Sequence, residues 1–137
     1  MDRKEPIMAK TENATVNTTI TNRYALELAE KHSISRLCVG REKLETTDII
    51  GEVLTIEDAD LAADVMIDGE LTTFSVYTFK EYPGKFMYGG MKLTNIAPDL
   101  IDIAKREKKT IADLGIQIIL KSVRAKNGNS FTDVQFI

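Results

Sequence analysis

The stretch LAADVMIDGELTTFSVYTFK, at residues 61–80, decides the fold, because two β-type segments flank a two-residue turn. Residues 61–67 and 69–80 are rich in branched and aromatic side chains, which favour extended strands. Between them, Asp68-Gly69 is one of the strongest short signals for a tight β-hairpin. The sequence therefore predicts two antiparallel strands joined at this turn.

Three further segments have strand character. Residues 46–57 alternate between apolar and polar side chains, and the acidic run at 57–60 that follows indicates a turn. Residues 115–126 and 129–137 flank an Asn-Gly pair, which is a second hairpin signal. We expect five strands, at 46–57, 61–67, 69–80, 115–126 and 129–137.

One amphipathic helix separates the third expected strand from the fourth. Pro98 suits the first turn of a helix, and Leu100 and Ala104 share a face before a basic run, so we expect a helix over 98–109. The segment at 80–93, KEYPGKFMYGGMKL, contains Pro-Gly and Gly-Gly pairs, which predict a long loop or ribbon.

The N-terminal part differs in composition. Residues 1–19 are polar, with too few large apolar groups to offset the entropy of ordering, which predicts a flexible arm. Asn22 is a suitable N-cap for a short helix that reaches Lys31. Its apolar stripe consists of Tyr24, Ala25 and Leu28. We therefore expect an arm with a short helix over 1–34, followed by one folded domain over 35–137.

The bulk properties bound the class of protein. The chain has 137 residues, of which 43% are hydrophobic and 28% charged, values typical of one globular domain. Its single cysteine excludes an internal disulfide, and the polar N-terminus does not resemble a signal peptide. We therefore expect a cytoplasmic protein that does not enter a membrane.

The charge is divided unevenly along the chain. Residues 1–70 contain 8 basic and 15 acidic side chains, whereas residues 71–137 contain 10 basic and 6 acidic ones. The total of −3 argues against a strongly basic nucleic-acid binder, but the C-terminal half carries a positive excess. Charge alone is equally consistent with a solvated acidic segment that precedes a mildly basic one.

The order strand, strand, strand, helix, strand, strand predicts a mainly β fold with helices, a five-stranded oligonucleotide-binding (OB) barrel. The segments TTFSVYTFKE, APDLIDIAKREKK and GIQIILKSVRAKNGNSFTDVQFI resemble in rhythm the single-stranded-DNA-binding proteins of phages and conjugative plasmids. That resemblance implies a role in replication, recombination or transfer of a mobile element. The chain departs from the family in having an acidic segment before the barrel and no acidic, proline-containing tail, so we expect no tail-mediated recruitment of enzymes.

Single-strand binders need aromatic faces for base stacking and cations that follow the phosphates. On residues 69–80, one face carries Tyr77 and Phe79 and the other carries Phe74 and Val76, so only one set can meet a ligand. We favour Tyr77 and Phe79, although core packing is the ordinary fate of such side chains. The complete predicted set is Tyr77, Phe79, Lys80, Tyr82, Lys85, Phe86, Tyr88, Lys92, Lys121, Arg124 and Lys126.

Other kinds of site have weaker support. An EF-hand loop begun at Asp58 would need Gly and Glu where Ala63 and Gly69 stand. His32 and Cys38 lack the sequence context of catalytic residues. We expect neither an enzyme nor a metal or other cofactor.

The leading hypothesis is thus a sequence-nonspecific protein that binds single-stranded DNA, with RNA as an open alternative. We also expect homo-oligomers that form through the N-terminal arm. One alternative is an OB-type protein-interaction or structural module of a phage or plasmid without nucleic-acid binding, since fold does not fix function. A third is a small-molecule or regulatory domain in which residues 83–90 act as a lid.

Overall fold

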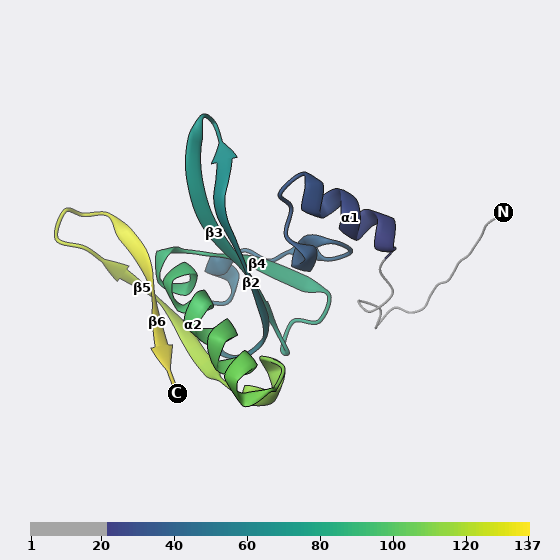
Figure 1. The fold of residues 1–137 in the computed structure, drawn as a ribbon. Coiled ribbons are helices and arrows are strands. Elements are labelled where there is room, and N and C mark those ends of the chain that lie inside the picture. Colours follow the sequence, from purple (N-terminus) through teal and green to yellow (C-terminus); the bar gives the residue numbers. More distant parts are fainter. Residues whose placement is uncertain (1–21) are drawn as a thin grey trace.

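The segments rich in branched and aromatic side chains pair into one curled, six-stranded mixed sheet that forms a half-barrel (Figure 1). The computed structural model describes residues 22–137. The expected flexible arm at 1–19, and the oligomer contact assigned to it, lie outside the described residues. The strands are β1 (Glu42–Lys43), β2 (Val53–Ile67), β3 (Glu70–Phe79), β4 (Lys85–Gly89), β5 (Gln117–Arg124) and β6 (Ser130–Phe136), and the α-helices are α1 (Arg23–Lys31) and α2 (Met91–Glu107).

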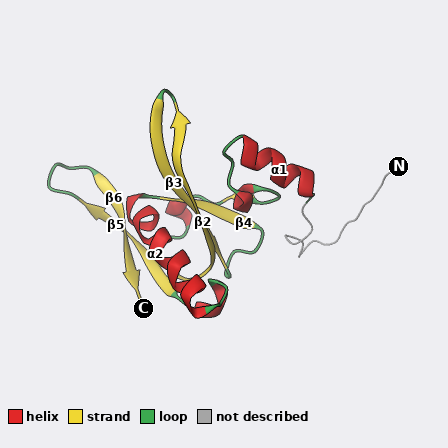
Figure 2. Ribbon diagram, viewed as in Figure 1, coloured by secondary structure: helices red, strands yellow, loops and turns green. Residues whose placement is uncertain are grey.

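Both expected hairpins are confirmed. Strands β2 and β3 are antiparallel and meet at Asp68 and Gly69, whose φ angles are 50° and 81°. Two consecutive positive φ values define the tight turn that an Asp-Gly pair favours. Strands β5 and β6 are antiparallel from Ile118 opposite Phe136 to Arg124 opposite Ser130. The two hairpins extend from the body as separate two-stranded ribbons (Figure 2).

The first two expected strands are one strand. The predicted turn at 57–60 is wrong, because β2 runs without interruption from Val53 to Ile67 and is 15 residues long. Its first residues pair with β5 and the remainder with β3, and irregularities in register fall between Ile56 and Asp58 and between Ala62 and Val65. Such bulges bend and twist a strand, which allows β2 to serve both halves of the curled sheet. The start at 46 is also wrong, since Thr46–Asp48 form a 3₁₀ turn.

The segment predicted as a long loop or ribbon contains a strand. Lys85–Gly89 form β4, which is antiparallel to β3 and, at its other edge, parallel to the two-residue β1. Gly89 is required where it lies, because a Cβ there would stand 2.2 Å from Ser75 Oγ and 2.9 Å from Leu93 Cβ. The sheet order is β1-β4-β3-β2-β5-β6.

Helix α2 begins seven residues earlier than Pro98, which is exposed within the helix. A proline inside a helix removes one backbone hydrogen bond and costs about 3 kcal/mol. The helix continues because a buried stripe at helical spacing, Leu93, Ala97, Leu100 and Ala104, packs against the sheet. Burial of this stripe therefore overrides the local proline signal.

The short helix α1 is confirmed at its expected place. The Asn22 side chain accepts a hydrogen bond from the Tyr24 backbone N–H at 2.7 Å. Its predicted apolar stripe is not what packs on the protein, however, since Tyr24 and Leu28 are 60% and 58% exposed and only Ala29 is buried. Within residues 22–137 no helix is both long and apolar enough to cross a bilayer.

Candidate nucleic-acid interface

The two aromatic side chains favoured as stacking platforms lie in the core. Tyr77 and Phe79 are 0% and 1% exposed and belong to the main apolar cluster with α2. The Tyr77 hydroxyl donates a hydrogen bond of 2.6 Å to the Leu93 backbone oxygen, and burial raises the pKa of this phenol. Assignment of Tyr77 and Phe79 to a ligand surface is therefore wrong, because this face of β3 is covered by the helix.

The opposite side of β3 and β4, here called the outer face, carries Phe74, Val76, Phe86 and Tyr88. The Tyr88 ring meets the Phe74 ring edge-on at 6.0 Å and the Phe86 ring at 5.5 Å, both distances between centroids. Phe86 is buried, whereas Tyr88 remains 44% exposed. The buried Phe86 ring and the partly buried Phe74 ring thus hold in place one ring that is open to solvent.

The N-terminal segment covers part of this outer face. Leu37, in the 3₁₀ turn Arg36–Cys38, packs with Val76 and Phe86 as a second apolar cluster. Ser35 caps this turn by accepting a hydrogen bond from the Leu37 N–H at 3.1 Å. The segment reaches Tyr88 through Cys38, and the exposed Tyr88 ring lines a groove.

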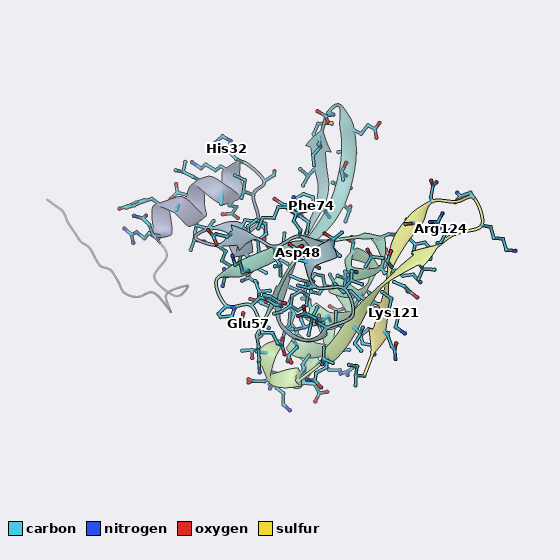
Figure 3. The ribbon with its side chains drawn as sticks, turned by 180° about the vertical axis from the view of Figure 1, so that it is seen from behind. His32, Asp48, Glu57, Phe74, Lys121 and Arg124 are labelled. Carbon is cyan, nitrogen blue, oxygen red and sulfur yellow. The ribbon has the colours of Figure 1, made fainter. Side chains whose placement is uncertain are left out.

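The groove lies between the end of α1 and the β2–β3 hairpin and has a volume of about 680 Å³. The Phe74 and Tyr88 rings form part of its wall, and aliphatic side chains of the hairpin form another part. Its lining residues are Lys31, His32, Ser33, Ile34, Ser35, Val65, Met66, Ile67, Thr72, Phe74 and Tyr88. Figure 3 shows Phe74 at the base of this hairpin and His32 on the loop that follows α1.

Two lysine side chains lie near the exposed Tyr88 ring or the groove beside it. The Lys43 ammonium lies 5.6 Å from the centroid of Tyr88, within the range of a cation–π contact. Lys31, at the other side of the groove, is exposed and forms a loose pair of 3.6 Å with Glu27 on its own helix. Lys43 also forms an exposed pair of 3.5 Å with Glu45. Surface ion pairs of this kind are weak, so a phosphate could displace either carboxylate.

Two acidic side chains of β2 beside the covering segment are already engaged. Arg36 donates to Asp58 at 3.0 Å, and the Ser35 hydroxyl donates to Asp60 at 2.8 Å. The hydrogen bond to Asp58 is the main reason that the pKa of Arg36 is raised. These contacts reduce the negative field that β2 would otherwise present to an anionic ligand.

Cys38 and Tyr88 adjoin each other at the edge of the groove. The thiol lies 3.9 Å from the Tyr88 hydroxyl. Burial is the main cause that raises the pKa of both groups. At neutral pH the phenol is therefore neutral and presents an uncharged ring to a base.

The remaining predicted residues do not form one surface with Tyr88. Tyr82 is half-buried and its hydroxyl donates to Glu52, whereas Lys85 is bonded to Glu42 at 2.7 Å. Lys92, in the first turn of α2, pairs with Asp133 at 3.6 Å. Lys80 is exposed in the turn after β3. Lys121, Arg124 and Lys126 are exposed on the β5–β6 ribbon, and Figure 3 shows Lys121 and Arg124 apart from Phe74 and His32.

Phe74 and Lys31 line the groove and Lys43 lies beside its Tyr88 ring, but none of the three is in the predicted set. Period-two alternation had identified Phe74 as the alternative face of its strand, so the signal for it existed in the sequence. Nothing comparable marked Lys43, because its place depends on a two-residue parallel pairing with β4. No cluster of three or more potential metal ligands occurs among the described residues.

Comparisons of the chain with protein-family models, with curated proteins and with solved structures found no match. The function is therefore inferred from the geometry of the groove and its rings.

Proposed function

We propose that this protein binds single-stranded nucleic acid without sequence specificity, on the outer face of β3 and β4, and that its sheet is a variant of the OB fold. The exposed Tyr88 ring, held edge-on by Phe74 and Phe86 and approached by the Lys43 ammonium, is the observation that carries this proposal. It combines a stacking platform with a cation for the adjoining phosphate.

The strand order supports the OB assignment. Without β1, the sheet runs β4-β3-β2-β5-β6, with α2 inserted between β4 and β5. An OB barrel has the same sequence of three strands, a helix and two strands, and it binds oligonucleotides on the face of its second and third strands. Those two strands correspond to β3 and β4. The departure is that β1, rather than β6, occupies the outer edge of β4.

The expected strength follows from the number of platforms. Stacking contributes about 1–3 kcal/mol per base, and Tyr88 with the partly buried Phe74 offers one to two positions. Every base has a flat face, so stacking of this kind is tolerant of sequence. With Lys43 and Lys31 as the nearby cations, we expect a shallow salt dependence, with a slope of about −1 to −2 in a plot of log affinity against log salt.

Fluorescence anisotropy of a labelled oligothymidine and of a matched duplex would test the proposal. We expect Tyr88→Ala to weaken single-strand binding about 5-fold to 100-fold while the protein stays folded. Phe136→Ala is a matched control, because Phe136 on β6 is 55% exposed and Tyr88 is 44% exposed. Equal affinities of wild type and Tyr88→Ala, or stronger binding of the duplex, would contradict the assignment.

A protein-interaction module is the second candidate. The groove also presents Ile34, Met66 and Ile67, which are 51%, 64% and 44% exposed. Exposed apolar side chains around a concavity are typical of sites that receive an apolar partner segment. Absence of oligonucleotide binding at low salt, together with binding of an apolar peptide that Met66→Asp abolishes, would favour this alternative.

A further inference from the structure

Three basic side chains of the β5–β6 ribbon are left without a counter-ion among the described residues. Lys121, Arg124 and Lys126 are all exposed, and none of the ion pairs within residues 22–137 includes them. Asp133, the residue directly opposite Lys121, pairs instead with Lys92 of α2. The ribbon therefore projects an uncompensated positive charge.

The end of the β2–β3 hairpin has the opposite character. Asp64, Asp68 and Glu70 are exposed, and no ion pair of the described residues includes them either. The sequence contains no Lys or Arg between Lys43 and Lys80, so the hairpin cannot neutralise itself. Two projecting ribbons of one molecule thus carry complementary charges.

Both ribbons also expose large apolar side chains near these charges. Met66 and Leu71, which are opposite each other on β2 and β3, are 64% and 66% exposed. Phe131 on β6 is 45% exposed and lies opposite Val123 on β5. Apolar residues among charged ones are typical of a protein–protein contact, in which the apolar groups are buried and the charges set the orientation.

The two ribbons of one molecule extend in different directions, and their ends lie apart (Figure 1). We propose that the basic β5–β6 ribbon of one copy docks on the acidic end of the β2–β3 hairpin of a second copy. The contact joins two different surfaces, so it leaves a free acidic hairpin at one end and a free basic ribbon at the other. Such a heterologous contact propagates into a ring or an open filament.

The contact has a consequence for the groove. Val65, Met66 and Ile67 of the β2–β3 hairpin line it, so docking places Lys121, Arg124 and Lys126 of the neighbouring copy beside it. This consequence rests on the proposed function, because those cations would extend the path of a phosphate backbone from one copy to the next. The contact between copies does not depend on nucleic acid.

Sedimentation velocity of the full chain, freed of nucleic acid, would test the contact over a range of concentrations at low salt. We expect species larger than the 15.3 kDa monomer, which dissociate at about 0.5 M salt where exposed charges are screened. The variant K121E/R124E/K126E should be monomeric. So should D64N/D68N/E70K, in which asparagine is chosen because Asp64 and Asp68 have positive φ, which Asn tolerates.

An equimolar mixture of these two variants should associate, although neither does alone. The altered β5–β6 ribbon of the first is acidic and the altered hairpin of the second is basic, and each variant retains one original surface. A merely structural effect of the substitutions would not be reversed by mixing. The matched control K105E/R106E/K109E makes the same change of charge at the end of α2 and should associate like the wild type.

A wild type that is monomeric at every concentration and at low salt would overturn the proposal. So would a mixture that stays monomeric while both variants retain the circular dichroism of the wild type. If instead the wild type associates only when oligonucleotide is added, the basic ribbon binds nucleic acid rather than a second copy. Equal single-strand affinities of the wild type and Tyr88→Ala, with intact self-association, would contradict the proposed function and leave this contact standing.

Discussion

The two faces of β3 and β4 carry the same kinds of residue but perform different tasks. The inner face, toward α2, holds Tyr77 and Phe79 at 0% and 1% exposure, with rings stacked at 6.3 Å. On the outer face, Phe74 and Phe86 support Tyr88, which stays 44% exposed. Aromatic composition thus locates a candidate strand, whereas the position of the helix decides which face remains available.

The largest effect should come from removal of an inner ring. Phe79→Ala deletes a fully buried side chain within the main apolar cluster, and such truncations cost about 3–5 kcal/mol. Urea denaturation should show this loss of stability. An outer-face change, Tyr88→Ala, should cost less than about 1 kcal/mol because nearly half of the ring is already in water. Equal losses for the two variants would break the distinction between the faces.

A smaller effect tests the close approach of β4 to β3 and α2. Gly89→Ala would place a Cβ 2.2 Å from Ser75 Oγ and 2.9 Å from Leu93 Cβ, so the helix or the strand must shift. We expect a loss of about 1–3 kcal/mol, which is typical of overpacking. Gly90→Ala is the control, because a Cβ there meets nothing within 4 Å. Similar melting temperatures for the two variants would contradict this account of the packing.

Removal of the Tyr77 hydroxyl measures how much its buried hydrogen bond contributes to stability. Tyr77→Phe deletes the hydrogen bond to the Leu93 backbone oxygen and retains the ring, which should cost about 1 kcal/mol. Oligonucleotide affinity should not change, because the hydroxyl is buried on the face that the helix covers. Weaker binding of nucleic acid by this variant at unchanged stability would return the ligand site to the inner face.

The smallest effect concerns the cation beside the outer ring. Lys43→Gln keeps a polar side chain but removes the ammonium that lies 5.6 Å from the Tyr88 centroid. Stability should change by less than about 0.5 kcal/mol, whereas the salt dependence of oligonucleotide binding should become shallower by about one unit of slope. An unchanged slope would mean that Lys43 does not meet a phosphate.

The sequence predicted correctly the features that depend on neighbouring residues. The Asp68-Gly69 turn, the Asn22 cap and the β5–β6 hairpin depend on residues adjacent in the chain. The continuity of β2 could not be predicted in this way, since its acidic stretch looks like a turn. It is held as a strand by pairing with β3, by the inward Ala59, and by Arg36 and Ser35, which come from more than 20 residues away.

The candidate site was only partly predictable for the same reason. Tyr88 and Phe86 were in the predicted set, but Lys43 and Cys38, which also lie beside Tyr88, come from the segment before β2 and are brought there only by the fold. The early start of α2 explains the main error, because the helix residue Leu93 reaches Tyr77 and closes the inner face. A proline at 98 had indicated a later start, and the buried stripe from Leu93 to Ala104 overrides it.

Photocrosslinking would show whether the outer face of β3 and β4 is the ligand surface. An oligothymidine with 5-iododeoxyuridine at single positions would be irradiated in complex with the protein, and the modified peptides would be identified by mass spectrometry. We expect crosslinks to Tyr88 or Phe74 that disappear when unlabelled single strand competes. Crosslinks confined to Phe131 on the β5–β6 ribbon, or none with a saturating oligonucleotide, would contradict this assignment.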